Sequence, residues 1–498
     1  MKRAPLIAAL LGAATVPGFA PFHLFPLPVV TLAGLVLLWQ RMPRRRDAAL
    51  AGFCFGLGYF LAGVSWVYIS LHDFGAMPAP LAAALTLAFC AYLALYPALV
   101  GLAYHALGAR SMFATLAALP ALWTLAECLR GTLLTGFSWL ELGYSQVPSS
   151  PLAGFVPLFG VHGATLLTAF SAALIAHAVQ RRNPRVYQAC AALLLALWFG
   201  GWLLQPVTWT RPAGKPLTVS LIQGNIPQEM KWRADQVAAT LDDYRRLVEA
   251  TRADLVVLPE TALPLFLQQV PAAYLDELAA HVRDNHGDLL IGIPEDGVGG
   301  DYYNSVLSFG ASPTQVYRKS HLVPFGEFVP LRPLFDWFLE AAQIPLGDFT
   351  RGTRAPQPLA VAGQQVAVDI CYEDAFGAEI TRQLPQATLL VNASNVAWFG
   401  RSLAPRQHLQ ISQTRALETG RYMLRATNTG VTAIIDPHGR VGQAAPGFTT
   451  AIVSGEVNGY TGATPYVRYG DAPVIALALL LTAVAIWLAL RKTAKIRG

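Results

Sequence analysis

Cys371 is the residue of this chain whose type and position first suggest chemistry. It directly follows residues 366–370, where alternating apolar side chains predict a buried strand, and Tyr372, Glu373 and Asp374 come directly after it. A thiol at the end of a strand, beside acidic residues, is a candidate nucleophile. A free cysteine is more often a small buried hydrophobic residue, so this segment alone leaves both interpretations open.

Two further residues with suitable chemistry also follow predicted strands. Glu260 comes after the buried strand predicted at residues 254–258, and Lys319 lies in the sequence VYRKSHLVPFGEF. Groups at the ends of strands in an open α/β sheet project into a common crevice, so these residues and Cys371 could converge. A thiol becomes a good nucleophile when a cation lies beside it or a base removes its proton. Taken singly, Glu260 could equally be a solvated turn residue and Lys319 a surface charge.

The elements that would position these residues lie in residues 205–471, which have an ordinary globular composition. Strands alternate with helices there, which predicts a layered α/β domain with a mixed sheet. Strands are expected at residues 217–223, 254–258, 288–293, 305–309, 365–370, 388–392, 430–435 and 450–457, and helices at 236–250, 272–285, 377–384 and 406–420.

The chain as a whole is too apolar for an ordinary soluble enzyme, because 54% of its residues are hydrophobic and only 13% are charged. Eight apolar runs could span a bilayer, at residues 4–19, 24–39, 49–71, 80–107, 112–137, 152–179, 186–204 and 473–490. We therefore expect a membrane domain of seven helices at residues 1–204, a catalytic domain at 205–471, and an eighth helix with a basic tail at 472–498. The first run leads directly into the second, so we interpret it as a membrane helix and not as a cleaved signal peptide.

The basic residues of the short loops predict the orientation, since loops rich in Lys and Arg stay in the cytoplasm. One set of alternate loops holds Lys2, Arg3, Arg41, Arg44, Arg45, Arg46, Arg110, Arg181, Arg182, Arg185, Arg491, Lys492, Lys495 and Arg497. The other set holds Arg130 alone. Both termini are therefore expected in the cytoplasm and residues 205–471 on the opposite face, which in a bacterium is the periplasm. Because residues 205–471 contain more acidic than basic residues, the basic pI does not indicate nucleic-acid binding.

Cysteine use agrees with this layout. Cys54, Cys90, Cys128 and Cys190 lie in or beside predicted spans, so Cys371 has no partner for a disulfide within residues 205–471. A lone thiol in an oxidising compartment is more readily explained by reactivity than by packing.

Two other features have open interpretations. Glu127 and Arg130 lie near the outer end of the fifth apolar run, where an ionisable residue is either functional or paired for structural reasons. Residues 334–344, LFDWFLEAAQI, are unusually apolar. They could form a lid that dips into the outer leaflet, or ordinary core.

The motifs together resemble a known family. LPET at Glu260, RKSHLVPFGEFVP at Lys319 and DICYED at Cys371 resemble the nitrilase, or carbon–nitrogen hydrolase, superfamily with its Glu-Lys-Cys triad. With the membrane layout, QGNIPQEMKW at residues 223–232, YNS at 303–305 and NASNVAWFG at 392–400, the whole chain resembles the bacterial apolipoprotein N-acyltransferase family. One departure is Val396, where the family pattern has Asp, and this puts a polar role at that position in doubt.

This resemblance implies the fold, the reaction and the partners. It implies an αββα sandwich beside the membrane helices, and ping-pong transfer of a phospholipid acyl chain, preferably from phosphatidylethanolamine, to the α-amine of a diacylated lipoprotein. Glu260 would be the general base, Lys319 would stabilise the thiolate and the oxyanion, and Cys371 would carry the acyl group as a thioester. Supporting or substrate-binding roles fall to Glu327, Tyr372, Glu373, Trp232 and Trp398. No cofactor or metal is implied, and the enzyme is expected to act as a monomer in the bacterial inner membrane.

Two other functions are compatible with the same residues. A membrane-anchored nitrilase-type amidase would share the triad but release its acyl group to water. A transporter or lipid-binding scaffold with a degenerate enzyme domain would not need Glu260, Lys319 and Cys371 to be intact, and their presence together argues against it.

Overall fold

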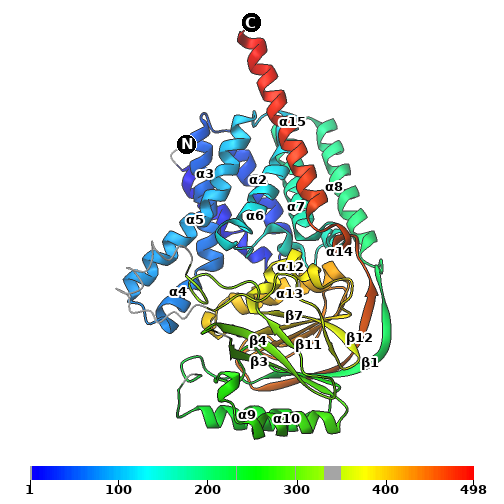
Figure 1. Ribbon diagram of the computed structural model, residues 1–498. Coiled ribbons are helices and arrows are strands. Elements are labelled where there is room, and N and C mark those ends of the chain that lie inside the picture. Colours follow the sequence, from blue (N-terminus) through cyan, green and yellow to red (C-terminus); the bar gives the residue numbers. More distant parts are fainter. Residues whose placement is uncertain (1–2, 232, 298, 330–348, 498) are drawn as a thin grey trace. The chain divides into compact units, whose positions relative to one another are not determined.

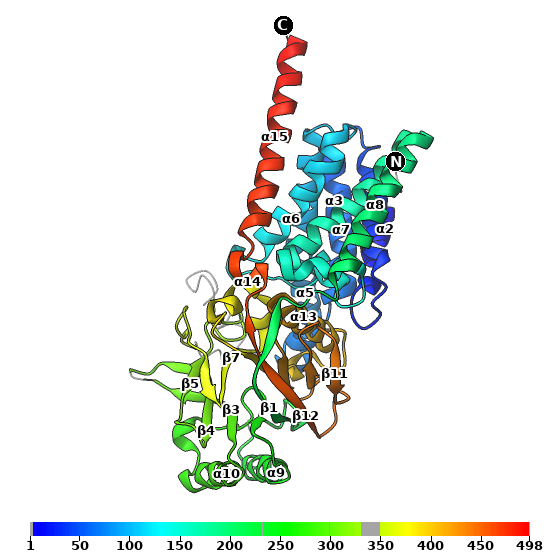
Figure 2. The ribbon, with the colours of Figure 1, turned by 90° about the vertical axis from the view of Figure 1, so that its right-hand side faces the viewer.

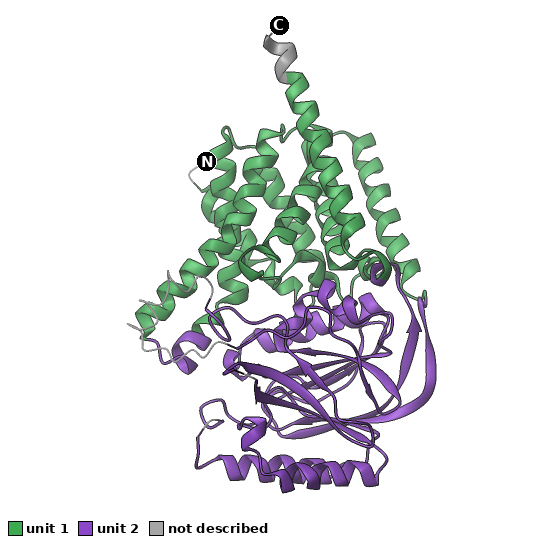
Figure 3. Ribbon diagram, viewed as in Figure 1, with its two compact units in different colours: residues 1–68, 78–207, 468–498 green, residues 69–77, 208–467 purple. Residues whose placement is uncertain are grey.

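The computed structural model describes residues 3–231, 233–297, 299–329 and 349–497 (Figures 1 and 2). Trp232 and the apolar residues 334–344, for which a lid and ordinary core were both considered, lie outside these ranges. The chain divides into two compact units, shown in Figure 3. The first unit comprises residues 1–68, 78–207 and 468–498, and the second comprises residues 69–77 and 208–467.

The first unit is helical. Its main helices are α1 (Ala4–Ala13), α2 (Pro26–Trp39), α3 (Arg45–Val64), α5 (Ala79–Ala106), α6 (Leu119–Arg130), α7 (Val156–Arg181), α8 (Pro184–Leu204) and α15 (Ala472–Arg497). Among the described residues, five helical segments are long and apolar enough to cross a membrane, and they include α3, α5, α7, α8 and α15. This unit therefore makes the chain a membrane protein.

Two of the eight predicted runs form shorter helices than a full span requires. The first two runs contain α1, of 10 residues, and α2, of 14 residues. The fifth run is helical without a break from residue 112 to Arg130, because a π-helical turn (Ala114–Ala118) leads directly into α6, which has 12 residues. Helix α6 ends just before Gly131, a residue that disfavours helix, and a short 3-10 turn (Leu133–Thr135) follows.

Glu127 and Arg130 of α6 are both buried and paired within the first unit. The Glu127 carboxylate accepts hydrogen bonds from Trp123 Nε1 at 2.9 Å, from the Leu142 backbone N–H at 3.0 Å and from Thr165 Oγ1 at 2.7 Å. The Arg130 guanidinium donates to two backbone carbonyls of the following loop. These contacts favour a structural role for Glu127 and Arg130, because they give hydrogen-bond partners to backbone groups of the loop that would otherwise be buried without one.

The second unit contains two six-stranded mixed sheets. The first has the order β12-β1-β2-β3-β4-β5 and the second the order β11-β10-β9-β8-β7-β6. The strands are β1 (Thr210–Gln223), β2 (Leu255–Val257), β3 (Asp288–Asp296), β4 (Tyr302–Gly310), β5 (Val316–Arg318), β6 (Leu359–Val361), β7 (Gln364–Ile370), β8 (Leu389–Ser394), β9 (Met423–Thr427), β10 (Ala433–Ile435), β11 (Val441–Ala444) and β12 (Ala451–Gly462). In each sheet a parallel centre of three strands, β1-β2-β3 or β7-β8-β9, is extended by antiparallel strands on both sides.

The two sheets pack face to face, with helices on both outer faces (Figure 1). Because side chains alternate along a strand, Leu255 and Val257 of β2 enter the core between the sheets, while Val256 faces helices α9 (Val237–Glu249) and α10 (Ala272–Asp284). In the second sheet, Val366 and Val368 of β7 enter the same core, and the opposite face packs against α12 (Gly377–Ile380) and α13 (Ala404–Thr419). This is the αββα sandwich that the resemblance implied, and that prediction is confirmed.

Every predicted strand and helix of this unit is present, with ends that differ by a few residues in most cases. The largest differences are β1 and β12, whose pairing runs from Thr210–Gly462 to Gln223–Ala451 and so extends well beyond the predicted apolar segments. The predicted helix at residues 377–384 is divided into α12 and a 3-10 turn (Thr381–Gln383). Four strands were not predicted, namely β5, β6, β9 and β11, because they are short or carry polar residues such as Arg425 in β9.

Candidate active site

The segment that carries Glu260 follows β2 and runs close beside β3. The Leu258 N–H donates to the Leu290 carbonyl at 2.8 Å, and the Ala262 N–H donates to the Gly292 carbonyl at 2.8 Å. A Cβ atom at Gly292 would lie 2.3 Å from the Pro259 carbonyl oxygen. Glycine at position 292 is therefore required for the backbone of Glu260 to lie against the sheet.

Lys319 follows β5 and lies between two carboxylates. Its Nζ is 2.8 Å from Glu327 Oε1 and 3.5 Å from Glu260 Oε1, and its side chain is only 1% exposed. Asn304 of β4 joins the same carboxylates, because its Nδ2 donates to Glu260 Oε1 at 2.8 Å and to Glu327 Oε1 at 2.9 Å. The backbone carbonyl of Asn304 also accepts a hydrogen bond from the Lys319 N–H. Strand β4 thus holds the Glu260 carboxylate and the Lys319 ammonium group in one fixed geometry.

Cys371 is the first residue after β7, and its backbone has φ +55°. This left-handed conformation is rare for residues other than glycine, and it turns the chain sharply at the end of the strand. The Cys371 carbonyl accepts hydrogen bonds from Asn392 Nδ2 and His408 Nε2, both at 3.1 Å, which hold the turn. Cys371 is buried and lies within electrostatic range of Glu260, Lys319 and Glu327.

Behind this turn is a buried polar network on the second sheet. Asp374 accepts hydrogen bonds from His408 Nε2 at 2.7 Å and from Ser412 Oγ, and Arg425 NH1 lies 3.3 Å from its other oxygen. Arg425 also donates to Asn392 Oδ1 at 2.7 Å. Because Asn392 and His408 also hold the Cys371 carbonyl, the network fixes the position of the sulfur-bearing residue through its backbone.

The charges of the site decide which group carries the proton at rest. Burial raises the pKa of the Cys371 thiol well above its usual value, and Glu260 raises it further, whereas Lys319 opposes the rise. Burial alone would raise the pKa of Glu260, but Lys319, Asn304 and Lys231 together hold it below its usual value. Burial would lower the pKa of Lys319, but Glu327 and Glu260 raise it. The resting site is therefore a neutral thiol beside an ionised carboxylate and an ammonium group.

This arrangement suits a nucleophile that is activated by a base and is not a thiolate at rest. Moving the proton from Cys371 to Glu260 is uphill in the resting site, so a base that accepts the proton as the sulfur forms its new bond would lower the barrier. The Glu260 carboxylate is oriented for this step, because its Oε2 accepts a hydrogen bond from the Asn395 N–H at 2.8 Å. The site can therefore perform acyl transfer through a covalent thioester.

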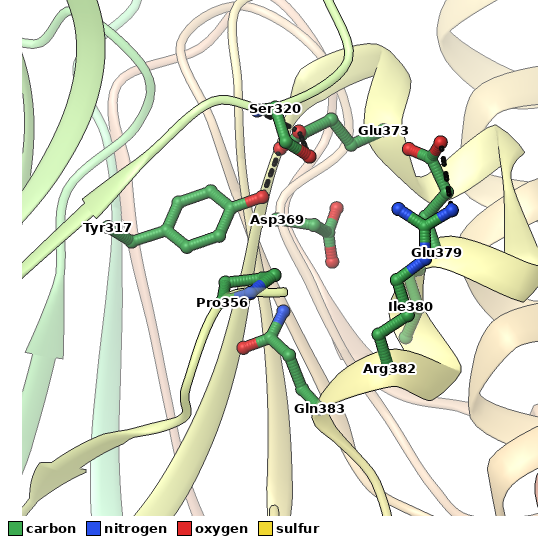
Figure 4. Close-up of a pocket in the computed structure, with 9 residues that line it drawn as sticks. All are labelled: Tyr317, Ser320, Pro356, Asp369, Glu373, Glu379, Ile380, Arg382 and Gln383. Carbon is green, nitrogen blue, oxygen red and sulfur yellow. Dashed lines mark hydrogen bonds and ion pairs between the residues drawn. The ribbon is translucent and has the colours of Figure 1, made fainter. Parts of the chain in front are cut away.

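Glu373 joins the Cys371 turn to the segment that carries Lys319. Its carboxylate accepts hydrogen bonds from the Ile370 N–H at 2.7 Å, the Ser320 N–H at 2.7 Å, the His321 N–H at 2.9 Å and the Tyr317 hydroxyl at 2.8 Å. Figure 4 shows Glu373, Ser320 and Tyr317 around a small polar pocket. The described residues that line this pocket do not include Glu260, Lys319 or Cys371. The pocket is therefore distinct from the candidate active site.

Replacing Glu373 by glutamine is expected to lower the free energy of unfolding by about 2–4 kcal/mol. The new NH₂ group would point at N–H and O–H donors, and those buried donors would lose their acceptor. The measurement is thermal unfolding of the protein in detergent. Glu379→Gln is the matched control, since Glu379 is 26% exposed and its ion pairs with His321 and Arg382 are partly solvated. Equal melting temperatures for the two variants would contradict a bracing role for Glu373.

The other predicted supporting residues have different surroundings. Tyr372 packs its ring against Phe376, with centroids 5.0 Å apart, and against His321 at 5.9 Å. Trp398 is 41% exposed, and its ring meets the Phe74 ring edge to face at 6.2 Å. Val396 is fully buried, as expected of an apolar residue at this position.

Several residues that contact Glu260 had no role predicted from the sequence. Asn304, Asn395 and Lys231 all touch Glu260, and each lies in a motif that was recognised only as part of the family pattern. Polar residues in a predicted buried strand, as in YNSVLSF for Asn304, are the feature of the sequence that points to such contacts. Within the described residues, no group of three or more His, Cys, Asp or Glu side chains could hold a metal ion.

Two family descriptions match most of the chain. Residues 11–174 match the family described as apolipoprotein N-acyltransferase N-terminal domain, and residues 218–466 match the carbon-nitrogen hydrolase family. The chain is similar to the apolipoprotein N-acyltransferase of Nitrosomonas europaea, with 56% identity over 96% of each chain. It is also similar to that of Chromobacterium violaceum, with 47% identity over 96% of this chain and 93% of the relative.

A solved carbon-nitrogen hydrolase from Helicobacter pylori is a more distant neighbour. It has 16% identity and a TM-score of 0.37 over 55% of this chain and 94% of its own. The identity and the coverage of the full-length relatives are the decisive findings, since both units are matched together. The chain belongs to the apolipoprotein N-acyltransferase family, within the carbon–nitrogen hydrolase superfamily.

Proposed function

We propose that this membrane enzyme transfers an acyl chain from a phospholipid to the N-terminal amine of the S-diacylglyceryl-cysteine of apolipoproteins, with Glu260, Lys319 and Cys371 as its catalytic residues. The observation that supports these roles most directly is the placement of Lys319 Nζ between Glu260 and Glu327, within electrostatic range of Cys371. Family membership supports the choice of reaction.

In the first half-reaction, Cys371 Sγ attacks the carbonyl carbon of the phospholipid ester while its proton moves to Glu260. A carbon–sulfur bond forms, and the negative charge on the tetrahedral oxygen is stabilised by Lys319. The carbon–oxygen bond then breaks, and Glu260 returns the proton to the leaving oxygen. The products are a lysophospholipid and an acyl thioester on Cys371.

In the second half-reaction, the lipoprotein amine attacks the thioester and gives a proton to Glu260. A carbon–nitrogen bond forms, the carbon–sulfur bond breaks, and Glu260 passes the proton to the Cys371 sulfur. The enzyme returns to its starting state and the product is an amide. Because donor and acceptor use the same sulfur in turn, the kinetics are ping-pong.

We further propose the setting of this reaction. Phosphatidylethanolamine is the acyl donor, the enzyme acts as a monomer in the inner membrane, both termini are cytoplasmic, and residues 205–471 face the periplasm between membrane segments at 1–204 and 472–498. The asymmetry of Lys and Arg between alternate loops supports this topology. Glu327 holds Lys319, Glu373 braces the Cys371 turn, and Tyr372 packs beside it. Trp232 and Trp398 contact the substrate.

The test is intact mass spectrometry of the purified protein after incubation with phosphatidylethanolamine. The expected result is an acyl-sized mass increase that hydroxylamine removes, followed by its discharge when a diacylated lipopeptide is added. A membrane-anchored amidase would instead lose the acyl group to water as quickly as to the lipopeptide. That result, or the absence of any adduct on folded protein, would contradict the proposal.

A further inference from the structure

A second lysine, Lys231, lies at the candidate active site and takes no part in the mechanism above. It is only 1% exposed, although lysine is rarely buried without a partner. Its Nζ donates to the backbone carbonyl of Glu260 at 3.3 Å. This is a long hydrogen bond to a neutral group, so the contact by itself does not explain why a charge is buried here.

The segment before Lys231 is held in place by two asparagines. Asn428 Oδ1 accepts from the Ile226 N–H at 2.9 Å, and Asn428 Nδ2 donates to the Ile226 carbonyl at 2.8 Å. Asn395 Nδ2 donates to Gln228 Oε1 at 2.9 Å, while the Asn395 N–H holds the Glu260 carboxylate. The same residue therefore fixes both the base and the segment that carries Lys231.

Among Glu260, Glu327, Lys319 and Lys231, the charges balance only when Lys231 is protonated. Lys319 is paired with Glu260 and Glu327, which leaves one negative charge uncompensated in that trio. The charge of Lys231 lowers the pKa of Glu260, and Lys231 also interacts with Cys371. With Lys231 protonated, the four charged groups sum to zero. They still sum to zero, with the thiolate included, when the Cys371 proton has moved to Glu260.

Among the described residues, the titratable groups that act on Lys231 come from two other strand ends, Glu260 after β2 and Cys371 after β7. On its own segment, Glu229 and Arg233 are exposed, and Arg233 is paired with Asp235. Burial lowers the pKa of Lys231 to about 8, although Glu260 and Cys371 oppose this shift. Lys231 is therefore an ammonium group below that pH and a neutral amine above it.

We propose that Lys231 is a positioning residue of this active site, whose ammonium group supplies the second positive charge that balances Glu260 and then the Cys371 thiolate. The proposal rests on the catalytic roles given above for Glu260 and Cys371. In this arrangement Lys319 and Lys231 have different tasks. Lys319 is locked between two carboxylates. Within the part of the chain that the structure describes, the Lys231 ammonium group donates to the neutral carbonyl of Glu260 and acts through its charge.

The experiment measures the rate of acyl-adduct formation from phosphatidylethanolamine between pH 6 and 10 for the full-length wild type, Lys231→Met and Lys231→Arg. Lys231→Met is expected to slow adduct formation about 10- to 100-fold at pH 7, because one nearby charge is lost in a poorly solvated site. The wild-type rate should decline above about pH 8 as Lys231 loses its proton. Arginine stays protonated, so Lys231→Arg should lose this decline.

Lys215→Met is the matched control, since Lys215 is exposed on β1 of the same unit, and its rate and pH profile should equal those of the wild type. A Lys231→Met profile equal to wild type would overturn the proposal. If Lys231→Met does not fold, as judged by thermal unfolding, the Lys231→Arg profile decides. A decline that stays near pH 8 in that variant would show that another group titrates.

A second readout separates this inference from the proposed function. Alkylation of Cys371 by iodoacetamide, followed on its peptide at pH 7, needs no lipid and should also be slower in Lys231→Met. If the wild type forms no acyl adduct, the proposed function fails, yet the alkylation rates still test the role of Lys231. If the adduct forms normally and both rates are unaffected by Lys231→Met, only the inference about Lys231 fails.

Discussion

Cys371→Ala is expected to form no acyl adduct and to lose N-acyltransferase activity by at least about 10⁴-fold, because no other group in the site can carry the acyl chain. The folded state should survive this change. The turn at Cys371 is held through its backbone carbonyl by Asn392 and His408, and these contacts do not involve the sulfur. The measurement combines intact mass after incubation with phosphatidylethanolamine and the rate of lipopeptide acylation.

Two further cysteine variants make this result specific. Cys371→Ser keeps the shape of the site but replaces the thiol with a hydroxyl of much higher pKa, so it should also be inactive with Glu260 as the only base. Cys128→Ala is the control, since Cys128 is a free cysteine of α6 in the other unit, and it should keep wild-type activity. Substantial adduct on Cys371→Ala, or its loss in Cys128→Ala, would contradict the assignment of the nucleophile.

Glu260→Gln is expected to lower the rate of acyl-adduct formation by about 10²- to 10⁴-fold, the usual contribution of a positioned general base. Glutamine has the same shape but cannot accept the Cys371 proton, and the raised pKa of the thiol leaves little thiolate without a base. Lys319 keeps its 2.8 Å contact with Glu327, so the cation should stay in place. Binding of the donor should change little, and the loss should appear in the rate constant at saturating lipid.

The variant should also be slow in the second half-reaction, because the incoming amine gives its proton to the same carboxylate. Discharge of a preformed thioester by a lipopeptide, measured by rapid mixing and mass analysis, checks this separately. Glu277→Gln provides the control, since Glu277 is half exposed on α10 and only weakly paired with Arg245. Retention of more than about a tenth of the wild-type rate by Glu260→Gln would exclude Glu260 as the general base.

The pattern of the sequence predicted the central strands well, because they are buried on both faces and read as short apolar runs. Residues 254–258 and 365–370 are the clearest cases, and they became β2 and β7 of the two sheets. Short edge strands such as β5 and β11 lack such runs. Strand β9 carries the charged Arg425, whose burial is compensated by an ion pair with Asp374 and a hydrogen bond to Asn392. The sequence around β9 does not indicate these partners, because they lie far away along the chain.

Some residues of the candidate site could likewise be predicted from the sequence, and others could not. Glu260, Lys319 and Cys371 stand out locally, because each is a reactive side chain at the end of a predicted strand. Asn304, Asn395 and Lys231 could not be assigned roles in advance, since their partner, Glu260, is at least 29 residues away along the chain. Hydrogen bonds between strand ends depend on the order and register of the strands, and these are properties of the assembled sheets.

Taken by itself, the sequence determined the membrane character of the chain, the α/β class of its globular part, the family resemblance and the identity of the candidate triad. Those features are local, since they depend on composition, periodicity and short motifs. The tertiary structure alone decided that the thiol is neutral at rest, that Glu373 braces the turn of Cys371, and that a second lysine is buried beside Glu260. The physical reason is that pKa values and burial depend on which groups are brought together from distant parts of the chain, and on the water excluded when they meet.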